Sequence, residues 1–273
     1  HLFLAPNCPW AHRTQLFRRL KGLEEVITIS LSDLPRTRSW AYSKGIGNGL
    51  DPIDGRFELH QAYVAAVPDY TGRVTVPTLW DKKQWTVVNN ESSEVIRMLN
   101  SEFNEWGNAL DFYPEDLRSE IDGYNERIYA TVNNGVYRCG FAKTQEAYEE
   151  AFDKLFGTLE WLEDHLADRR YLCGERMTEA DWRQYVTLVR FDFVYYSHFK
   201  CNKRRIRDHH NLWNYLKDLY QYPGIAEITD IPGIKRGYYG GMKNVNPSGI
   251  VPKGPDDIDL TEPHDRDRLA KVA

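Results

Sequence analysis

The N-terminal part of the chain alternates between strand-like and helix-like hydrophobic patterns. An apolar run over 1–5 meets a loop at Pro6, and residues 9–22 then carry apolar side chains at helical spacing. A second apolar run over 25–30 predicts another strand. A strand, a helix and a strand in this order favour a parallel pair of strands joined by a right-handed crossover.

The next stretch, over 33–72, is rich in Gly, Pro, Asp and Arg and predicts a long irregular insertion. Loops of this length inside a compact domain are usually functional or disordered. Beyond it, apolar runs over 75–80 and 84–88 flank three polar residues and predict an antiparallel hairpin. A helix is expected over 91–103.

The rest of the chain is helical in pattern and contains no convincing strand. Apolar residues at helical spacing predict helices over 117–137, 145–166 and 213–222. Another helix is expected to begin at Thr178, whose hydroxyl can cap the free N–H groups while Asp181 returns a hydrogen bond.

Together these elements predict an α/β domain on the thioredoxin-like plan followed by an all-helical domain. The expected boundaries are a thioredoxin-like domain over 1–103 with its insertion at about 33–72, a linker over 104–114, a helical domain over 115–235 and an irregular tail over 236–273.

Composition excludes several classes of protein. The 273 residues carry 35 Lys and Arg against 40 Asp and Glu, and a net charge of −5 makes general nucleic-acid binding unfavourable. No apolar run approaches the ~20 residues that span a bilayer, so we expect no membrane partner. No segment resembles a signal peptide, although a chain that begins at His1 rather than Met leaves room for a removed leader.

A basic cluster over 200–207 is the one local excess of positive charge. We expect it to be a solvated face or the rim of a substrate entrance rather than a nucleic-acid site. Its members are Lys200, Lys203, Arg204, Arg205 and Arg207.

The cysteines are sparse, lie far apart and lack the spacing of a metal site. Sparse cysteines are typical of a reducing compartment, so we expect a cytoplasmic protein without structural disulfides. His209 and His210 are adjacent, but neighbouring helical side chains point about 100° apart, and we expect no metal. The four cysteines are Cys8, Cys139, Cys173 and Cys201.

Cys8 is the strongest candidate for a reactive residue. It lies between the first predicted strand and helix, with Pro9 at the first helical position. Unpaired N–H groups and the partial positive charge at a helix N-terminus stabilise a thiolate and can lower a thiol pKa from ~8.5 to between ~3.5 and ~7.5. His12 and Arg13, one turn on, can add positive charge. The alternative is a small buried side chain that only fills space.

The residue three positions after Cys8 is Ala11, so the Cys-x-x-Cys pattern of a dithiol redox site is absent. A mixed disulfide on Cys8 would need a second thiol from solution or from a distant cysteine. A soluble thiol is the simpler of the two.

Two further segments can bind a peptide ligand. A proline at a strand entry on this plan is commonly cis, and a cis Val76–Pro77 bond would expose the backbone groups of Val76. Glu91 and Ser92 precede a helix, so the serine and neighbouring N–H groups can hold a carboxylate while the glutamate binds an ammonium. The alternatives are a trans edge-strand proline and an ordinary helix cap.

Cys8, the Val76–Pro77 step and Glu91–Ser92 together form the glutathione-site pattern of glutathione transferases. Across nearly the whole chain, further segments resemble the glutathionyl-hydroquinone reductases, which are the Xi-class glutathione transferases. The segments that carry this resemblance are Cys8–Thr14, Gly72–Pro77, Asn89–Ser92, Asn133–Tyr137, Arg190–Asp192, His198–Cys201, Tyr238–Tyr239 and Asn246–Pro252.

The resemblance implies an enzyme that reduces glutathionyl-hydroquinones to hydroquinones, consuming glutathione and releasing glutathione disulfide. It implies a homodimer, glutathione as the co-substrate and Cys8 as the nucleophile. The implied glutathione contacts are Trp40, Arg73, Val76, Glu91 and Ser92. The implied quinone-facing residues are Tyr137 and the Tyr238–Tyr239 pair, with Tyr137 and Tyr238 as the candidate proton donors.

Two alternatives remain open at this stage. An Omega-like thioltransferase or dehydroascorbate reductase shares the single-cysteine chemistry, but the long insertion, the segment around Tyr137 and the tail argue against it. A non-catalytic binding protein on the same fold is also possible, and the placement of Cys8 at a helix end argues against that reading.

Overall fold

The structure is a computed structural model, and it describes residues 1–36, 39–43 and 58–269. Within these ranges, no helix is both long enough and apolar enough to cross a membrane.

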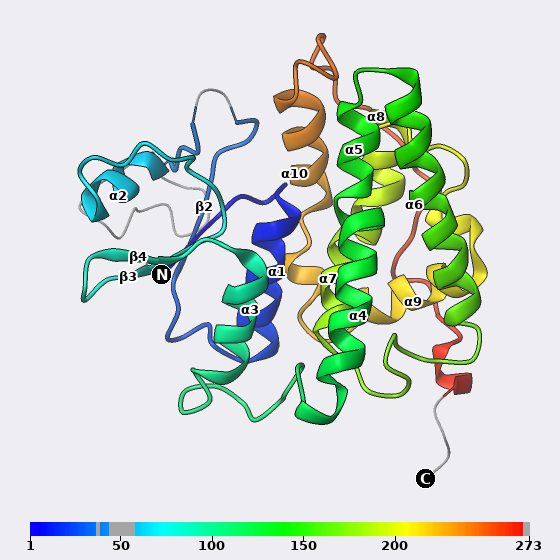
Figure 1. Cartoon of the computed structure of the whole chain (residues 1–273), viewed down its shortest axis with the longest axis horizontal. Helices are drawn as coiled ribbons and strands as arrows, with labels where there is room; N and C mark the ends of the chain where they lie inside the picture. Colours follow the sequence, from blue (N-terminus) through cyan, green and yellow to red (C-terminus); the bar gives the residue numbers. More distant parts are fainter. Residues whose placement is uncertain (37–38, 44–57, 270–273) are drawn as a thin grey trace. The chain divides into compact units, whose positions relative to one another are not determined.

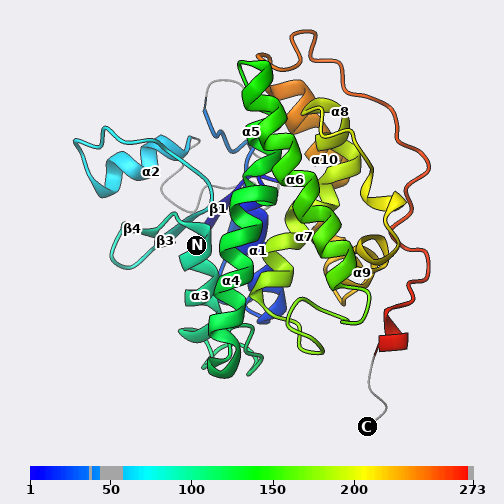
Figure 2. The same cartoon turned by 45° about the vertical axis from the view of Figure 1, so that its right-hand side comes forward.

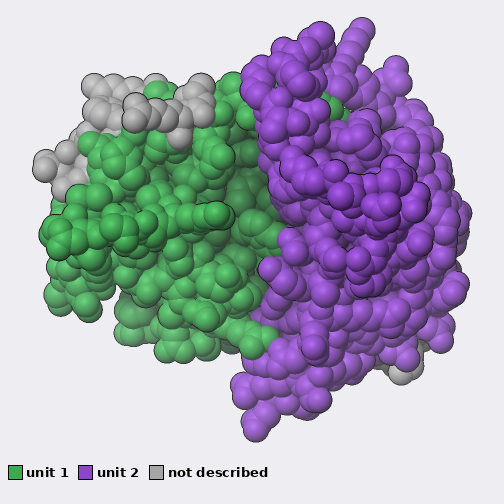
Figure 3. Space-filling view, turned by 45° about the horizontal axis from the view of Figure 1, so that its top comes forward, with its two compact units in different colours: residues 1–110, 228–241 green, residues 111–227, 242–273 purple. Residues whose placement is uncertain are grey.

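The chain divides into two compact units, coloured separately in Figure 3. Unit 1 comprises His1–Leu110 and Ile228–Gly241, and unit 2 comprises Asp111–Glu227 and Met242–Ala273.

Unit 1 is built on a four-stranded mixed sheet with the strand order β2-β1-β3-β4. β1 (Leu2–Leu4) pairs in parallel with β2 (Ile29–Leu31) and antiparallel with β3 (Thr78–Asp81). β3 continues as an antiparallel hairpin into β4 (Thr86–Asn89). The predicted parallel pair and the predicted hairpin are therefore confirmed.

Three of the helices in the described part of unit 1 come from its first 110 residues (Figure 1). α1 (Pro9–Leu20) and α3 (Ser92–Ser101) pack against each other, and α2 (Leu59–Ala66) packs on β4. Leu16 and Phe17 of α1 are completely buried, because the apolar stripe seen in the sequence faces the interior of the unit.

Two expectations for unit 1 need correction. The strand expected over 25–30 begins only at Ile29, because a turn precedes it in which the N–H of Ile27 donates to the carbonyl of Leu23 at 2.9 Å. The insertion expected to be irregular over 33–72 contains α2, whose start is stabilised by reciprocal hydrogen bonds between Glu58 and Gln61. Residues 44–57 of the insertion lie outside the described residues.

The regular elements of unit 2 are helices, and none of the four strands of the sheet lies in its described part (Figure 2). α5 packs on α6, α4 on α7, and α9 on both α6 and α7. The helices are α4 (Arg118–Ile128), α5 (Gly135–Phe141), α6 (Gln145–His165), α7 (Glu179–Arg190), α8 (Tyr196–His198) and α9 (His210–Tyr220).

The structure refines three helices predicted in unit 2. The single helix expected over 117–137 is divided by a π-helical turn, Tyr129–Asn133, which a search for regular 3.6-residue periodicity does not detect. α9 begins at His210, three residues before the expected Trp213. The capping pair at the start of α7 is confirmed, because Asp181 accepts from the backbone N–H of Thr178 at 2.8 Å.

The segment 228–241 belongs to unit 1, whereas the sequence placed it in the helical domain and the tail. It forms α10 (Ile231–Lys235) and a π-helical turn, Arg236–Gly240. A Cβ atom on Gly237 would lie 2.4 Å from the Cβ of Asn7, so this turn packs against the residue that precedes Cys8. Such a return contact joins residues far apart in sequence, and local patterns do not reveal it.

The end of the chain is mostly irregular, as expected, but unit 2 holds it firmly. Arg266 is completely buried and donates to the carbonyl of Leu166 at 2.9 Å, and Lys217 donates to the carbonyl of Pro263 at 2.7 Å. Arg205 and Arg207 of the basic cluster form ion pairs with Asp257 at 3.0 and 2.7 Å. These two arginines therefore fasten the tail.

Candidate active site at the start of helix α1

Cys8 occupies the N-cap position of α1, the longest helix in the described part of unit 1. Its backbone is extended (φ −76°, ψ 120°), and its carbonyl accepts the first helical hydrogen bond from His12 at 3.0 Å. Pro9 at the first helical position has the fixed φ that suits this start. The half-buried side chain therefore lies at the positive end of a helix, where a thiolate is stabilised.

The carbonyl oxygen of Val76 lies 3.6 Å from the sulfur of Cys8 and accepts from its thiol. The Val76–Pro77 bond is cis, which confirms the isomer expected from the sequence. The structure thus brings together two segments of the predicted pattern that are 68 residues apart in the chain.

Glu91 and Ser92 lie at the start of α3, as predicted. Glu91 is the N-cap, and its carboxylate accepts from the backbone N–H of Ser93 at 3.1 Å and from the Ser93 hydroxyl at 3.0 Å. The capping role that the sequence left as an alternative is therefore present. A carboxylate can still accept further donors, so capping does not prevent Glu91 from binding a ligand cation.

Arg13 links the starts of α1 and α3, which the sequence did not reveal. Its side chain is 1% exposed, and its guanidinium donates to the hydroxyl of Ser92 at 3.4 Å. The same guanidinium lies 4.5 Å from the ring centre of Trp10. The sequence indicated only that Arg13 could add positive charge near Cys8, because a partner 79 residues away leaves no local signal.

Trp40 and Arg73, two further predicted glutathione contacts, have no described side-chain contact with Cys8. Trp40 is half-buried, and the guanidinium of Arg36 lies 4.6 Å from its ring centre. Its indole N–H is buried and has no hydrogen-bond partner within the described part of the chain. Arg73 is exposed, and its carbonyl accepts from the Tyr70 hydroxyl at 2.8 Å.

Tyr238 and Tyr239 lie in the π-helical turn of unit 1 that packs against Asn7. Both are buried, with 1% and 5% of their surfaces exposed. Their position next to Gly237 places them in the same unit as Cys8, although the sequence assigned them to a separate tail.

Tyr137 belongs to unit 2 and lies in an aromatic cluster. Its ring centre is 5.3 Å from that of Phe199 and 6.0 Å from those of Phe141 and Tyr195. Tyr137 is half-buried, so part of its side chain reaches solvent.

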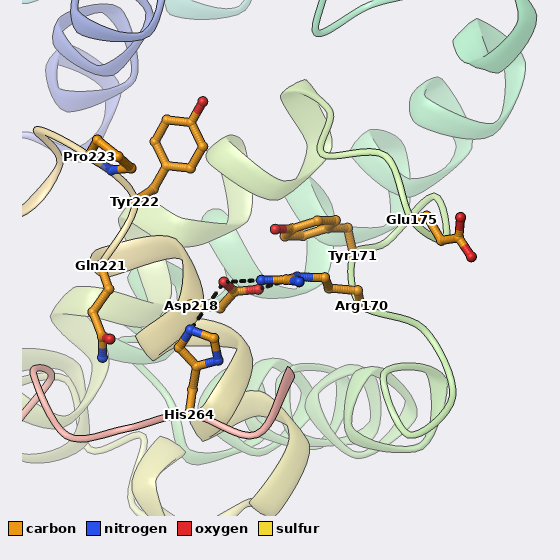
Figure 4. A pocket seen from close by; sticks show the side chains of 8 residues that line it. All are labelled: Arg170, Tyr171, Glu175, Asp218, Gln221, Tyr222, Pro223 and His264. Carbon is orange, nitrogen blue, oxygen red and sulfur yellow. Dashed lines mark hydrogen bonds and ion pairs between the residues drawn. The ribbon is translucent and has the colours of Figure 1, made fainter. Parts of the chain in front are cut away.

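A cavity of about 510 Å³ in unit 2 contains none of the predicted site residues (Figure 4). Arg170 donates twice to Asp218 at 3.0 Å, and the ring of His264 approaches the same carboxylate at 3.4 Å. This network pairs Arg170 with Asp218 and joins the tail to the same carboxylate through His264. Its lining residues are Arg170, Tyr171, Glu175, Asp218, Gln221, Tyr222, Pro223 and His264.

No group of three or more His, Cys, Asp or Glu side chains within the described ranges is arranged to hold a metal ion. The absence of a metal requirement stays a prediction.

Two family profiles match the chain. Residues 7–102 match the glutathione S-transferase N-terminal domain, and residues 145–218 match the glutathione S-transferase C-terminal domain. The chain is 52% identical to the glutathionyl-hydroquinone reductase PcpF of Sphingobium chlorophenolicum, over 93% of this chain and 82% of the relative. It is 50% identical to the glutathionyl-hydroquinone reductase YqjG of Escherichia coli, over 98% of this chain and 82% of the relative.

Solved structures give the same result. The glutathione-bound structure of YqjG from Escherichia coli superposes with a TM-score of 0.94 at 49% identity, covering 98% of this chain and 88% of that one. A Xi-class glutathione transferase from Natrialba magadii superposes with a TM-score of 0.95 at 48% identity, covering 98% of this chain and 83% of that one.

Proposed function

Because this chain belongs to the glutathionyl-hydroquinone reductases, the Xi-class glutathione transferases, we propose that it reduces glutathionyl-hydroquinones to hydroquinones at the expense of glutathione. The observation that carries this proposal is the placement of Cys8 at the start of α1, with its sulfur 3.6 Å from the carbonyl of Val76. A thiol at this position can ionise near neutral pH and exchange with another sulfur.

The reaction proceeds in two exchanges on Cys8. The Cys8 thiolate attacks the glutathionyl sulfur of the conjugate, the carbon–sulfur bond breaks, and the departing aromatic carbon takes a proton. Cys8 is then joined to glutathione by a disulfide. A second glutathione thiolate attacks the glutathionyl sulfur of this disulfide, which releases glutathione disulfide and restores the Cys8 thiolate.

The glutathione moiety is held by Trp40, Arg73, Val76, Glu91 and Ser92 in this proposal. The Glu91 carboxylate suits the ammonium of the tripeptide, and the start of α3 with Ser92 suits one of its carboxylates. The backbone of Val76 supplies a donor and an acceptor to the peptide. Arg13 donates to the hydroxyl of Ser92 and is a positioning residue in this proposal.

Tyr137, Tyr238 and Tyr239 form the aromatic subsite of this proposal. A phenol can donate the proton that the aromatic carbon takes, or it can hydrogen-bond a substrate hydroxyl. Tyr137 and Tyr238 are the candidate donors. Replacing each with Phe separates the two roles, because loss of a proton donor lowers kcat while loss of a substrate contact raises KM.

We also propose that the protein acts as a homodimer in the cytoplasm. The family supports the dimer, and four free cysteines are in keeping with a reducing compartment. Light scattering coupled to size-exclusion chromatography measures the oligomeric state directly.

The test compares wild type with Cys8→Ser on glutathionyl-menadione. The wild type should reduce glutathionyl-menadione. The turnover rate of the variant should be lower by a factor of about 10³ or more, as expected for loss of a nucleophile. Cys173→Ser is the matched control and should retain wild-type turnover. Retained turnover in Cys8→Ser would show that Cys8 is not the nucleophile.

Dehydroascorbate provides the second arm of this test. A reductase specific for glutathionyl-hydroquinones should reduce it poorly, whereas an Omega-like enzyme should prefer it. A protein that neither turns over either substrate nor binds glutathione would be a non-catalytic binding protein.

A further inference from the structure

A buried glycine in the turn after α10 packs against the residue that precedes Cys8. A Cβ atom on Gly237 would lie 2.4 Å from the Cβ of Asn7, 2.5 Å from its Cγ and 2.8 Å from its Nδ2. Carbon atoms that are not bonded to each other prefer separations of about 3.5–4.0 Å. The two segments therefore meet at a distance that only a residue without a side chain allows.

The backbone conformation of Gly237 does not itself require glycine. Gly237 lies in the π-helical turn Arg236–Gly240 and is not among the described glycines with a positive φ. In a helical conformation, alanine is favoured over glycine by roughly 0.5–1 kcal/mol where space permits it. The close approach to Asn7 is therefore the feature that requires glycine at this position.

Asn7 is joined tightly to Cys8. The N–H of Cys8 donates to the carbonyl of Ala5 at 3.0 Å, which closes a turn that has Asn7 inside it. Ala5 directly follows β1 and α1 begins at Pro9, so this short turn connects two fixed elements. Ala5 and Asn7 are 2% and 8% exposed, and the turn is thus buried. A displacement of Asn7 would therefore displace Cys8, which is one peptide bond away.

The segment that carries Gly237 is held within unit 1 as well. Asp230 caps α10, and its carboxylate accepts from the backbone N–H of Gly233 at 2.8 Å. Ile234 of α10 is 1% exposed. At the other end of the turn, a Cβ on Gly240 would lie 3.3 Å from the Cβ of Pro35, in the loop after β2. An atom added to Gly237 therefore presses on the turn that contains Asn7.

We propose that Gly237 is a positioning residue for Cys8, because its close contact with Asn7 fixes the turn that places the Cys8 sulfur at the start of α1. The same π-helical turn carries Tyr238 and Tyr239, so one contact holds the nucleophile and these two tyrosines in one arrangement. An effect of Gly237 on turnover rests on the proposed function, whereas an effect on the ionisation of Cys8 does not.

The test measures the pH midpoint of Cys8 alkylation by iodoacetamide, followed by peptide mass, together with the turnover of glutathionyl-menadione. It compares four forms of the full chain: wild type, Gly237→Ala, Asn7→Gly and the double variant. Glycine, alanine and asparagine are uncharged, so a changed midpoint reports a changed position of the sulfur and not a changed charge beside it.

Gly237→Ala should raise the midpoint toward the ~8.5 of an ordinary thiol. It should lower turnover by about 10²-fold, as expected when a reacting atom is misplaced by about 1 Å. In a chain that already carries Asn7→Gly, the same alanine should change neither quantity, because the three atoms nearest to its Cβ are gone.

Gly241→Ala is the matched control from the same segment. A Cβ on Gly241 would lie 3.7 Å from the Cβ of Pro35, which is an ordinary contact, so both quantities should keep their wild-type values. A folded Gly237→Ala protein with the wild-type midpoint would overturn the proposal, as would a raised midpoint that is equally raised when Asn7→Gly is present.

If Gly237→Ala does not fold, the double variant decides. It should fold and share the midpoint of Asn7→Gly, and a double variant that does not fold would overturn the proposal, because the alanine would then clash with atoms other than those of Asn7. A raised midpoint in Gly237→Ala beside a wild type that does not reduce glutathionyl-menadione would refute the proposed function and leave the positioning role of Gly237 standing.

Discussion

Cys8 in unit 1 and Cys173 in unit 2 are both half-buried, yet their surroundings act on the thiol in opposite ways. Cys8 begins a helix and faces the positive end of its peptide dipoles. Cys173 lies between α6 and α7, where burial raises the pKa of its thiol to about 12 and the nearby carboxylates of Asp181 and Glu120 add to the shift. Exposure alone therefore does not identify a reactive cysteine, and the charges and dipoles around the sulfur decide.

The same contrast extends to the two units. In unit 1, Cys8 lies at the positive end of α1, and the buried guanidinium of Arg13 lies one turn on. In unit 2, burial makes it harder for several ionisable side chains to carry a charge. It raises the pKa of Asp192 to about 6 and lowers the pKa of His198 to about 4.

Among substitutions that test this contrast, we expect the largest loss of stability from replacing Asp181 in unit 2. Its buried carboxylate accepts from Thr178, from the N–H of Leu172 at 2.9 Å and from the hydroxyl of Tyr215 at 2.8 Å. Asp181→Ala leaves these donors without their acceptor and should lower the free energy of unfolding by about 3–5 kcal/mol, measured by urea denaturation. It also removes a negative charge near Cys173.

Asp181→Asn is the matched control, because it keeps one acceptor oxygen and the side-chain volume. It should lose less stability than Asp181→Ala. Equal losses in the two variants would mean that the hydrogen bonds contribute little at this site.

A smaller effect is expected from His198, and it depends on pH. Its pKa in the folded protein, about 4, lies below the unfolded value of 6.5, so the unfolded chain binds the extra proton between these values. The contribution of His198 to the free energy of unfolding is therefore fully present above pH 6.5. It decreases by on the order of 3 kcal/mol as the pH falls to 4. Asp192 opposes this slope, because its raised pKa favours the folded state at low pH.

His198→Gln should remove the contribution of the histidine and leave that of the aspartate. The stability of wild type relative to the variant should therefore fall between pH 7 and pH 4, measured by urea denaturation at each pH. A difference that does not change with pH would show that His198 is not held neutral.

The smallest expected effect is at the start of α3 in unit 1. Glu91→Ala removes a helix cap and should lower the free energy of unfolding by about 1 kcal/mol.

If Glu91 also binds the ammonium of glutathione, the variant should raise the KM for glutathione about tenfold. Glu94→Ala, in the first turn of the same helix, is the control and should leave KM unchanged. An unchanged KM in Glu91→Ala would limit that residue to capping.

Local sequence patterns predicted the elements that depend on local chemistry. Pro9 after Cys8 marks the start of α1, and Thr178 with Asp181 marks the start of α7. Two apolar runs that flank three polar residues predicted the β3–β4 hairpin, with the strand ends shifted by one to three residues.

Contacts between distant segments left no such pattern. The hydrogen bond from Arg13 to Ser92 and the packing of Gly237 against Asn7 depend on tertiary structure. The π-helical turn at Tyr129–Asn133 was not predicted, because its hydrogen bonds join residues five apart and do not follow the 3.6-residue period. For these features, the sequence supplied the residues but not their partners.

The most direct test of the central claim is the pH dependence of alkylation of Cys8 by iodoacetamide, followed by peptide mass with Cys173 measured in the same sample. We predict that Cys8 reacts with a midpoint well below the ~8.5 of an ordinary thiol and that Cys173 stays unreactive over the same range. A Cys8 midpoint at or above ~8.5 would contradict the account, because the start of α1 would then not stabilise the thiolate.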